Sequence, residues 1–419
     1  MFRKVLFTFS TRFLSSLLSF LIVVITARAI GAAGRGEITL VMLGCSINLM
    51  INSIVGGNAL VLLTPSTEPW RLLVPSWVWV IISNLTVTAI LHVFGLVPPH
   101  LSIHVLFISI MQSVASVHMM VYLGRQRIIL YNLLGLLQTL ILAGGVCFMI
   151  FVLKVSTVSG YINCLYISFA VQLLVSIFYL PGLVTRVKLE NVKSTIREIL
   201  KHGLVIQLSN VAQLFNYRLS YFFLEYFIGM AALGVFSTAS TVAESVWLIS
   251  RSISLVQYSG IVNSKDEGYN RRMTLRMSKL SIAGSLAALL PLSLLPPSFY
   301  AYVFGEEFSG IGTQILLLSP GIMALAFATV LAHYFAGLGL NKLNLYTSLT
   351  GLAATVPAAL VLIPLFGMNG AAIAVSISYM VTSTHLYIIF KKKTGMKLRE
   401  LIPERADFEF VKTQFFKKS

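Results

Sequence analysis

Four ionisable side chains lie within an apolar stretch of the sequence, where charges are costly. Arg218, Glu225, Glu244 and Arg251 all fall within residues 215–251. On each of two expected helices, an arginine and a glutamate are seven residues apart, which is close to two turns, so each pair lies on one helix face. At about 1.5 Å per residue, Arg218 and Glu244 fall within roughly one turn of the same depth. We therefore expect Arg218 and Glu244 to meet.

These charges have two possible uses. A charged side chain near the centre of a bilayer costs about 3 kcal/mol on insertion scales, so such groups usually face a partner or a water-filled cavity. An ion pair of Arg218 with Glu244 or Glu225 could simply hold helices together. Arginine also binds phosphate groups through its planar fork of donors. A buried glutamate can take up a proton or a cation and so change the energy of a cavity.

The elements that must position these side chains are membrane-spanning helices. Hydrophobic residues make up 57% of the 419 residues and charged residues 11%, with a mean hydropathy of +0.86. This composition is too apolar for a soluble domain of that length. The apolar runs are continuous and lack period-two alternation, which favours helices over the strands of a membrane barrel. The sequence therefore predicts an all-α integral membrane protein.

Twelve apolar runs are long enough to cross about 30 Å of hydrocarbon. They lie at residues 5–30, 38–63, 72–97, 101–123, 128–153, 158–184, 203–228, 231–256, 279–300, 311–337, 343–365 and 368–390.

Basic residues are distributed unevenly over the connections. Of the 31 Lys and Arg residues, 25 lie at the two ends or in alternate connections, whereas the intervening connections hold only Arg28, Arg35 and Lys154. By the positive-inside rule this asymmetry places both termini in the cytoplasm. The net charge of +17 then indicates topology and contact with anionic membrane lipids, and no nucleic-acid partner is expected. The basic connections 185–202 and 257–278 are predicted to be amphipathic helices on the cytoplasmic surface.

Three short motifs recur in the same order in the two halves of the chain. Ile30-Gly31 with Gly36 recurs as Ile228-Gly229 with Gly234, residues 123–131 match residues 338–346, and Gly160 with residues 166–169 matches Gly370 with residues 376–379. The offsets are 198, 215 and 210 residues. Parallel repeats of this kind imply a pseudo-twofold axis along the membrane normal, with a central cavity for the substrate.

The repeat divides the chain into two lobes of six helices each. We expect an N-terminal lobe at residues 1–184, a cytoplasmic linker at 185–202, a C-terminal lobe at 203–390 and a basic cytoplasmic tail at 391–419.

No motif for an enzyme or a cofactor accompanies the helices. The three cysteines lie in apolar runs without metal-binding spacing. The sequence contains no Walker motif, nucleophile elbow or zinc-binding helix. We predict no catalytic residue, no metal and no cofactor.

Glycine-rich turns and the closing segment carry a family resemblance. The turns are Ala29-Ile-Gly31-x-x-Gly34-x-Gly36, Gly56-Gly-Asn-Ala59 and Leu233-Gly-Val-Phe236, and the closing segment is residues 364–379, PLFGMNGAAIAVSISY. Over essentially its whole length, the chain resembles the polysaccharide-type transporters, the O-antigen and related flippases of the multidrug/oligosaccharidyl-lipid/polysaccharide exporter superfamily.

The resemblance implies two rocking six-helix lobes around a central cavity. It also implies a substrate, an oligosaccharide linked to undecaprenyl diphosphate, which moves from the cytoplasmic to the periplasmic leaflet of the bacterial inner membrane. Such transport serves O-antigen or a similar surface polysaccharide. It is driven by an ion gradient, with H⁺ or Na⁺ as the coupling ion. Proteins of polysaccharide assembly are possible partners, and the superfamily's default state is a monomer.

Fixed cations would lower the barrier for the anionic diphosphate. The candidates are Arg12, about two turns into the first helix, together with Arg218, Arg251 and Arg28. Arg28, near the outer end of the first helix, could instead extend to the lipid headgroups.

Two glutamates are candidates for ion coupling. Glu244 is the better of them because of its depth, whereas Glu225, about one turn from the outer surface, could be an ordinary interfacial charge.

Two other functions fit the sequence less well. A cation-coupled multidrug exporter of the same superfamily predicts a negative or apolar cavity, and three intramembrane arginines against two glutamates disfavour it. A membrane-bound glycan polymerase or ligase typically needs a large periplasmic loop, and the outer connections here are short.

Overall fold

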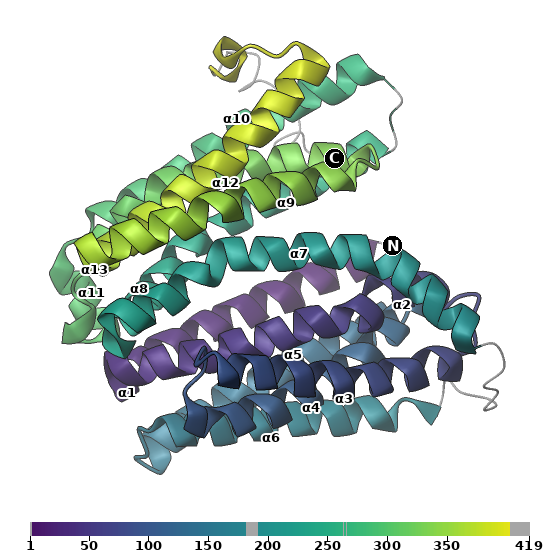
Figure 1. Ribbon diagram of the computed structural model, residues 1–419, viewed down its shortest axis with the longest axis vertical. Helices are drawn as coiled ribbons and strands as arrows, with labels where there is room; N and C mark the ends of the chain where they lie inside the picture. Colours follow the sequence, from purple (N-terminus) through teal and green to yellow (C-terminus); the bar gives the residue numbers. More distant parts are fainter. Residues whose placement is uncertain (1, 182–191, 263, 265, 403–419) are drawn as a thin grey trace. The chain divides into compact units, whose positions relative to one another are not determined.

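The computed structural model of the chain describes residues 2–181, 192–262, 264 and 266–402 (Figure 1). These residues form helices joined by short connections, without a β-strand among them. In chain order the helices are α1 Phe2–Gly56, α2 Asn58–Leu63, α3 Pro69–Val93, α4 Pro99–Gly124, α5 Ile128–Cys147, the π-helical turn η1 Phe148–Val152, α6 Val158–Phe178, α7 Val192–Ile228, α8 Met230–Ser245, α9 Trp247–Val262, α10 Glu267–Leu294, α11 Pro297–Phe304, the 3₁₀ turn η3 Glu306–Phe308, α12 Ile311–Gly337, α13 Asn341–Thr394 and the 3₁₀ turn η4 Leu398–Leu401.

The predicted number of membrane spans agrees with these helices. Within the part of the chain that the structure describes, nine helical segments are long and apolar enough to cross a membrane. Two of these segments each contain two predicted spans, which are separated by a glycine with non-helical dihedral angles. One segment is α1 with α2, where the glycine is Gly31 (φ 81°, ψ 177°), and the other is α13, where it is Gly367 (φ 57°, ψ −132°). The predicted span at 203–228 lies within α7, which is not one of the nine segments. Nine segments, two of which hold two spans each, together with α7 account for the twelve predicted spans. The all-α class with twelve spans is therefore confirmed.

The connections near the predicted cytoplasmic side differ from the sequence prediction. The amphipathic surface helix expected at residues 257–278 is wrong, because α9 runs on to Val262 and α10 begins at Glu267. Asp266 fixes that start, since its carboxylate accepts a hydrogen bond from the Gly268 N–H at 2.8 Å. In the predicted linker 185–202, residues 192–202 form the first turns of α7, and residues 185–191 lie outside the described residues. Residues 403–419 of the predicted tail also lie outside the described residues.

The chain forms two compact units. Unit 1 comprises Met1–Leu214, Ile228–Thr238 and Tyr300–Ser309, and unit 2 comprises Phe215–Phe227, Ala239–Phe299 and Gly310–Ser419. Each has its own hydrophobic core, around Leu72 and Val117 in unit 1 and around Phe335 and Phe390 in unit 2. The lobe boundaries expected from the sequence repeat stay a prediction.

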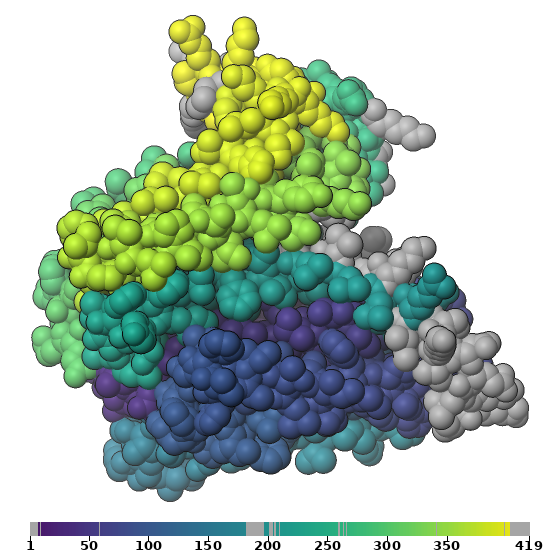
Figure 2. Space-filling model, in the orientation of Figure 1, coloured from purple at the N-terminus to yellow at the C-terminus, as the bar shows by residue number. Residues whose placement is uncertain are grey.

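Within each unit, one helix packs against three others. In unit 1, α1 packs against α3, α4 and α5, and in unit 2, α12 packs against α9, α10 and α13 (Figure 1). In Figure 2, side chains of α13, coloured lime to yellow, lie at the surface of unit 2, and its apolar residues Val361 and Leu365 are exposed. Apolar side chains on an outer face are what a helix bundle in hydrocarbon requires.

Two turns that the sequence repeat relates to one another have the same hydrogen-bond pattern. The α4–α5 turn has three backbone hydrogen bonds, donated by residues 125, 126 and 127 to the carbonyls of residues 121, 123 and 122. The α12–α13 turn repeats them from residues 338, 339 and 340 to residues 334, 336 and 335. The same pattern ends α3, where residues 94, 95 and 96 donate to the carbonyls of residues 90, 92 and 91, so it is a common way to end a helix and does not test the predicted offset of 215 residues. Each turn contains one left-handed residue, Gln126 (φ 59°) or Gly339 (φ 75°).

A second part of the repeat lies within unit 1, where equivalent residues meet each other. A Cβ on Gly36 of α1 would be 2.1 Å from the Met230 carbonyl oxygen, and a Cβ on Gly234 of α8 would be 1.8 Å from that of Ala32. The hydroxyls of Thr39 and Ser237 are 2.8 Å apart. Three pairs of residues that are 198 apart in the sequence take part in this contact: Ala32 and Met230, Gly36 and Gly234, and Thr39 and Ser237. A local twofold axis therefore passes between these helices, whose backbones touch because both carry glycine.

Candidate functional site

The centre of the candidate site is a two-pronged ion pair in unit 2. Arg218 of α7 donates from Nη1 to Oε1 of Glu244 at 2.8 Å and from Nη2 to Oε2 at 2.6 Å. The side chains are 27% and 16% exposed, so the pair is only partly covered. Nη1 also donates to the Tyr221 hydroxyl, one turn further along α7, at 2.7 Å. The predicted meeting of Arg218 and Glu244 is confirmed.

A break between two helices sets the position of Glu244. The residue lies next to the end of α8, and the chain turns at Val246 before α9 begins at Trp247. In this turn the Val246 N–H donates to the Ala243 carbonyl at 3.3 Å, and the Ile249 N–H donates to the Val246 carbonyl at 3.1 Å. Glu244 and Trp247 therefore enter the site from two short helices rather than from one straight span.

A third element, α13, completes the environment of the pair. The hydroxyl of Tyr379, which is 1% exposed, lies 3.4 Å from Oε1 of Glu244. The ring of Tyr217 makes edge contacts with Tyr379 and Trp247, at centroid distances of 5.2 and 5.4 Å. We call these three rings the aromatic cluster. Trp247 is held in turn by its indole N–H, which donates to the Thr329 hydroxyl at 2.6 Å.

The aromatic cluster also carries the second predicted cation of this unit. The guanidinium carbon of Arg251 lies 3.7 Å from the centroid of the Trp247 ring, and the Arg251 side chain is exposed. A cation at this distance over an indole face is stabilised by the ring quadrupole. The structure therefore links Arg218, Glu244 and Arg251 through the aromatic cluster.

The other three predicted site residues lie elsewhere. Glu225 belongs to unit 2 and is partly buried, but it forms none of the ion pairs found among the described residues. Arg12 and Arg28 belong to unit 1, where Arg12 is exposed on α1. Arg28 donates to the Tyr302 carbonyl at 3.2 Å and lies 5.8 Å from the centroid of the Tyr302 ring. Arg28 is therefore bound to Tyr302 of the same unit.

The segment that holds Arg28 also caps the kink in α1. The Ala32 N–H, which follows the Gly31 kink, donates to the carboxylate of Glu307 at 2.5 Å. A carboxylate at a helix start accepts an otherwise unpaired N–H and interacts favourably with the helix dipole. Tyr302 and Glu307 therefore fasten residues 300–309 to both sides of Gly31 within unit 1.

A buried polar cluster fixes α7 against α13. The side-chain oxygen of Asn216 accepts hydrogen bonds from Thr355, at 3.0 Å, and from Ser378, while its amide donates to Thr382 at 3.2 Å. Asn216 is 1% exposed. Because Asn216 is two residues before Arg218 and Ser378 directly precedes Tyr379, this cluster also sets the positions of those two site residues.

Sequence reasoning missed Tyr379, Trp247 and Glu307. Tyr379 belongs to the closing repeat motif, but an isolated hydroxyl in an apolar run gives no sign of its partner. Glu307 lies in a loop 275 residues from its partner Ala32, a pairing that only the fold brings about.

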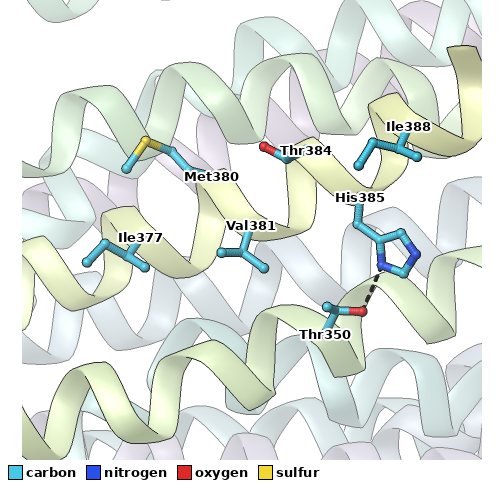
Figure 3. A pocket seen from close by; sticks show the side chains of 7 residues that line it. All are labelled: Thr350, Ile377, Met380, Val381, Thr384, His385 and Ile388. Carbon is cyan, nitrogen blue, oxygen red and sulfur yellow. Dashed lines mark hydrogen bonds between the residues drawn. The ribbon is translucent and has the colours of Figure 1, made fainter.

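A groove of about 580 Å³ lies along α13, between its two halves (Figure 3). Apart from a hydrogen bond of 2.8 Å between Thr350 and His385, its wall is mostly hydrocarbon. Its lining residues are Thr350, Ile377, Met380, Val381, Thr384, His385 and Ile388. No arginine lines it, so we do not place the anion site there.

Comparisons with known proteins give the fold a family context. No protein-family model matches the sequence. The chain is 24% identical over 172 residues, 40% of its length, to the capsular polysaccharide biosynthesis protein CapF of Staphylococcus aureus, and the match spans 43% of that protein. An inward-facing multidrug resistance MATE family transporter of the MOP superfamily matches 91% of the chain with a TM-score of 0.73 at 17% identity, covering 94% of that structure. The lipid II flippase MurJ matches 95% with the same TM-score at 12% identity, covering 89% of that structure.

Proposed function

We propose that this chain, which has the fold of the MOP superfamily of transporters, is a flippase for an oligosaccharide carried on undecaprenyl diphosphate. In this proposal it moves the repeat unit of O-antigen or a similar surface polysaccharide from the cytoplasmic to the periplasmic leaflet of the bacterial inner membrane by alternating access. It carries out no covalent chemistry. The name of the capsular polysaccharide relative and the lipid II specificity of MurJ support a lipid-linked sugar as the substrate.

The observation that carries the proposal is that two arginines are linked to the aromatic cluster, Arg218 through Glu244 and Arg251 through Trp247. Both guanidinium groups belong to apolar helices, where a lone charge is costly. Arg251 is exposed and stacked on Trp247, so its planar donors are available to a phosphate group. Aromatic rings beside cations also suit a sugar next to its phosphate.

The remaining predicted residues have proposed roles at other points of transport. Arg12 and Arg28 would contact the diphosphate from the first helix, and Glu244 or Glu225 would bind the coupling ion, H⁺ or Na⁺. Membrane lipids surround the chain, and polysaccharide assembly proteins are proposed partners of the monomer.

Deleting the gene in its host tests the proposal. We expect lipid-linked oligosaccharide to accumulate on the cytoplasmic leaflet while surface polysaccharide is lost. Wild type and Arg272→Ala, which removes an exposed arginine at the start of α10, should restore both; Arg218→Ala and Arg218→Lys should restore neither, because lysine keeps the charge but not the fork. Membrane levels of each variant are measured alongside.

The second candidate is a multidrug exporter, favoured by the fold similarity to a MATE family transporter. If deletion leaves surface polysaccharide normal and changes tolerance to cationic drugs, the exporter function replaces the flippase function.

A further inference from the structure

Three of the five N–H donors of Arg218 are occupied in this structure. Both prongs of its fork point to the two oxygens of Glu244, and the Tyr221 hydroxyl takes a further N–H of Nη1. A phosphate group presents two oxygens to arginine with the same two-pronged geometry. The carboxylate of Glu244 and a phosphate would therefore compete for one edge of Arg218.

We propose that Glu244 is the internal counter-anion of Arg218, and that a diphosphate lipid displaces it, so that diphosphate binding and protonation of Glu244 favour one another. This inference rests on the proposed function, because it takes the substrate to be a diphosphate.

The groups around Glu244 determine the fate of its carboxylate after displacement. From α7 it faces Arg218, which also binds Tyr221, and from α13 it faces Tyr379, whose ring contacts Tyr217. Of these only Arg218 is a cation. A carboxylate that has lost Arg218 to a phosphate keeps only the long contact with the Tyr379 hydroxyl, and a charge so weakly paired at that depth is costly. It is neutralised by taking one proton from water, which makes it a carboxylic acid.

Thermodynamic reciprocity fixes the sign of this coupling. If diphosphate binding favours protonated Glu244, then protonating Glu244 must strengthen diphosphate binding by the same factor. A proton on Glu244 and the diphosphate on Arg218 would therefore be bound at the same time. If the protein exchanged one for the other, diphosphate binding would instead have to disfavour protonation of Glu244. Glu244 would thus balance the positive charge of Arg218 while the empty protein returns. An ion that is exchanged for the substrate would then bind at the other candidate, Glu225.

The test measures binding to the full-length protein in lipid nanodiscs. The probe is a short-chain prenyl diphosphate esterified to one sugar, because its two phosphates lack the second ionisation near pH 6 and keep a constant charge. Wild type should bind it more tightly at pH 5.5 than at pH 8. Glu244→Gln should bind about tenfold more tightly than wild type at pH 8, within the range of typical coupling factors, and should lose the pH dependence. Glu267→Gln, an exposed acid at the start of α10, should behave as wild type.

A measurement on wild type alone guards against a variant that fails to fold. Adding the probe in weakly buffered solution should raise the pH, because Glu244 takes up a proton. Three outcomes would each overturn the inference and leave the flippase proposal intact. These are no rise in pH, weaker binding of the probe by Glu244→Gln than by wild type, and loss of the pH dependence in Glu225→Gln instead of Glu244→Gln. Absence of any probe binding by wild type at either pH would overturn both.

Discussion

At the scale of single residues, the structure gives a specific partner to three charged groups, Arg218, Arg28 and Glu307. Arg218 is paired through both prongs with Glu244, and Arg28 donates to the backbone of Tyr302. Glu307 accepts the N–H that follows the kink at Gly31. A charge beside apolar helices is stable only when such a partner offsets its loss of water, so each of these contacts supports the local fold.

We expect Glu307→Ala to destabilise unit 1 by about 1 kcal/mol, the usual effect of removing a helix cap. The Ala32 N–H loses its acceptor, while the contacts of Arg28 with Tyr302 remain. Thermal unfolding of the purified protein measures the effect. Glu306→Ala, which removes the neighbouring exposed acid, is the control; equal effects from both variants would show that the cap does not contribute.

At the scale of helices, glycines decide how closely the backbones approach. Gly36 and Gly234 allow the second half of α1 and the start of α8 to touch, with the Thr39 and Ser237 hydroxyls bonded across the contact. Gly31 and Gly367 let two spans join without a loop, because a positive φ strains any residue with a Cβ.

We expect Gly36→Ala to destabilise the protein by about 1–3 kcal/mol, the usual cost of overpacking. The new methyl group would lie 2.1 Å from the Met230 carbonyl oxygen, so the two helices must separate and stretch the bond between Thr39 and Ser237. The midpoint of unfolding in denaturant reports the change.

Gly144→Ala is the matched control for that experiment. Gly144 lies within α5, and a Cβ there meets no atom within 4 Å. Alanine is up to about 1 kcal/mol more favourable than glycine in a helix, so this variant should be neutral or stabilising. Destabilisation of similar size in both variants would mean that the close helix contact is not the cause.

At the scale of the whole molecule, the distribution of basic residues predicts the topology. The positive-inside rule places the α4–α5 turn in the cytoplasm and the connection before α6 outside. Both connections carry exposed residues suitable for labelling, Gln126 and Ser156.

Cysteine labelling of intact cells tests this topology. In a background with Cys45, Cys147 and Cys164 replaced, Ser156→Cys should react with an impermeant maleimide from outside. Gln126→Cys should react only after the membrane is permeabilised. The reverse pattern would place both termini outside and would contradict the predicted direction of transport.

Composition and the lengths of apolar runs were enough to predict the class and the spans. A bilayer requires continuous apolar helices of nearly fixed length, and the sequence shows them directly. The meeting of Arg218 and Glu244 was also predictable, because both lie at similar depth on consecutive helices joined by a short turn. Boundaries were less predictable: no apolar signal marks where a helix ends outside hydrocarbon, so the start of α10 at Glu267 was missed.

Only the tertiary structure decided which distant residues complete the site. Tyr379 reaches Glu244 from 135 residues away, and Glu307 caps Ala32 from 275 residues away. The sequence by itself determined that this chain is a bundle of helices in a membrane with arginines at depth, because burial in lipid acts on composition. The partners of those arginines depend on how helices far apart in the sequence pack, and that packing depends on the side-chain shapes of the whole fold.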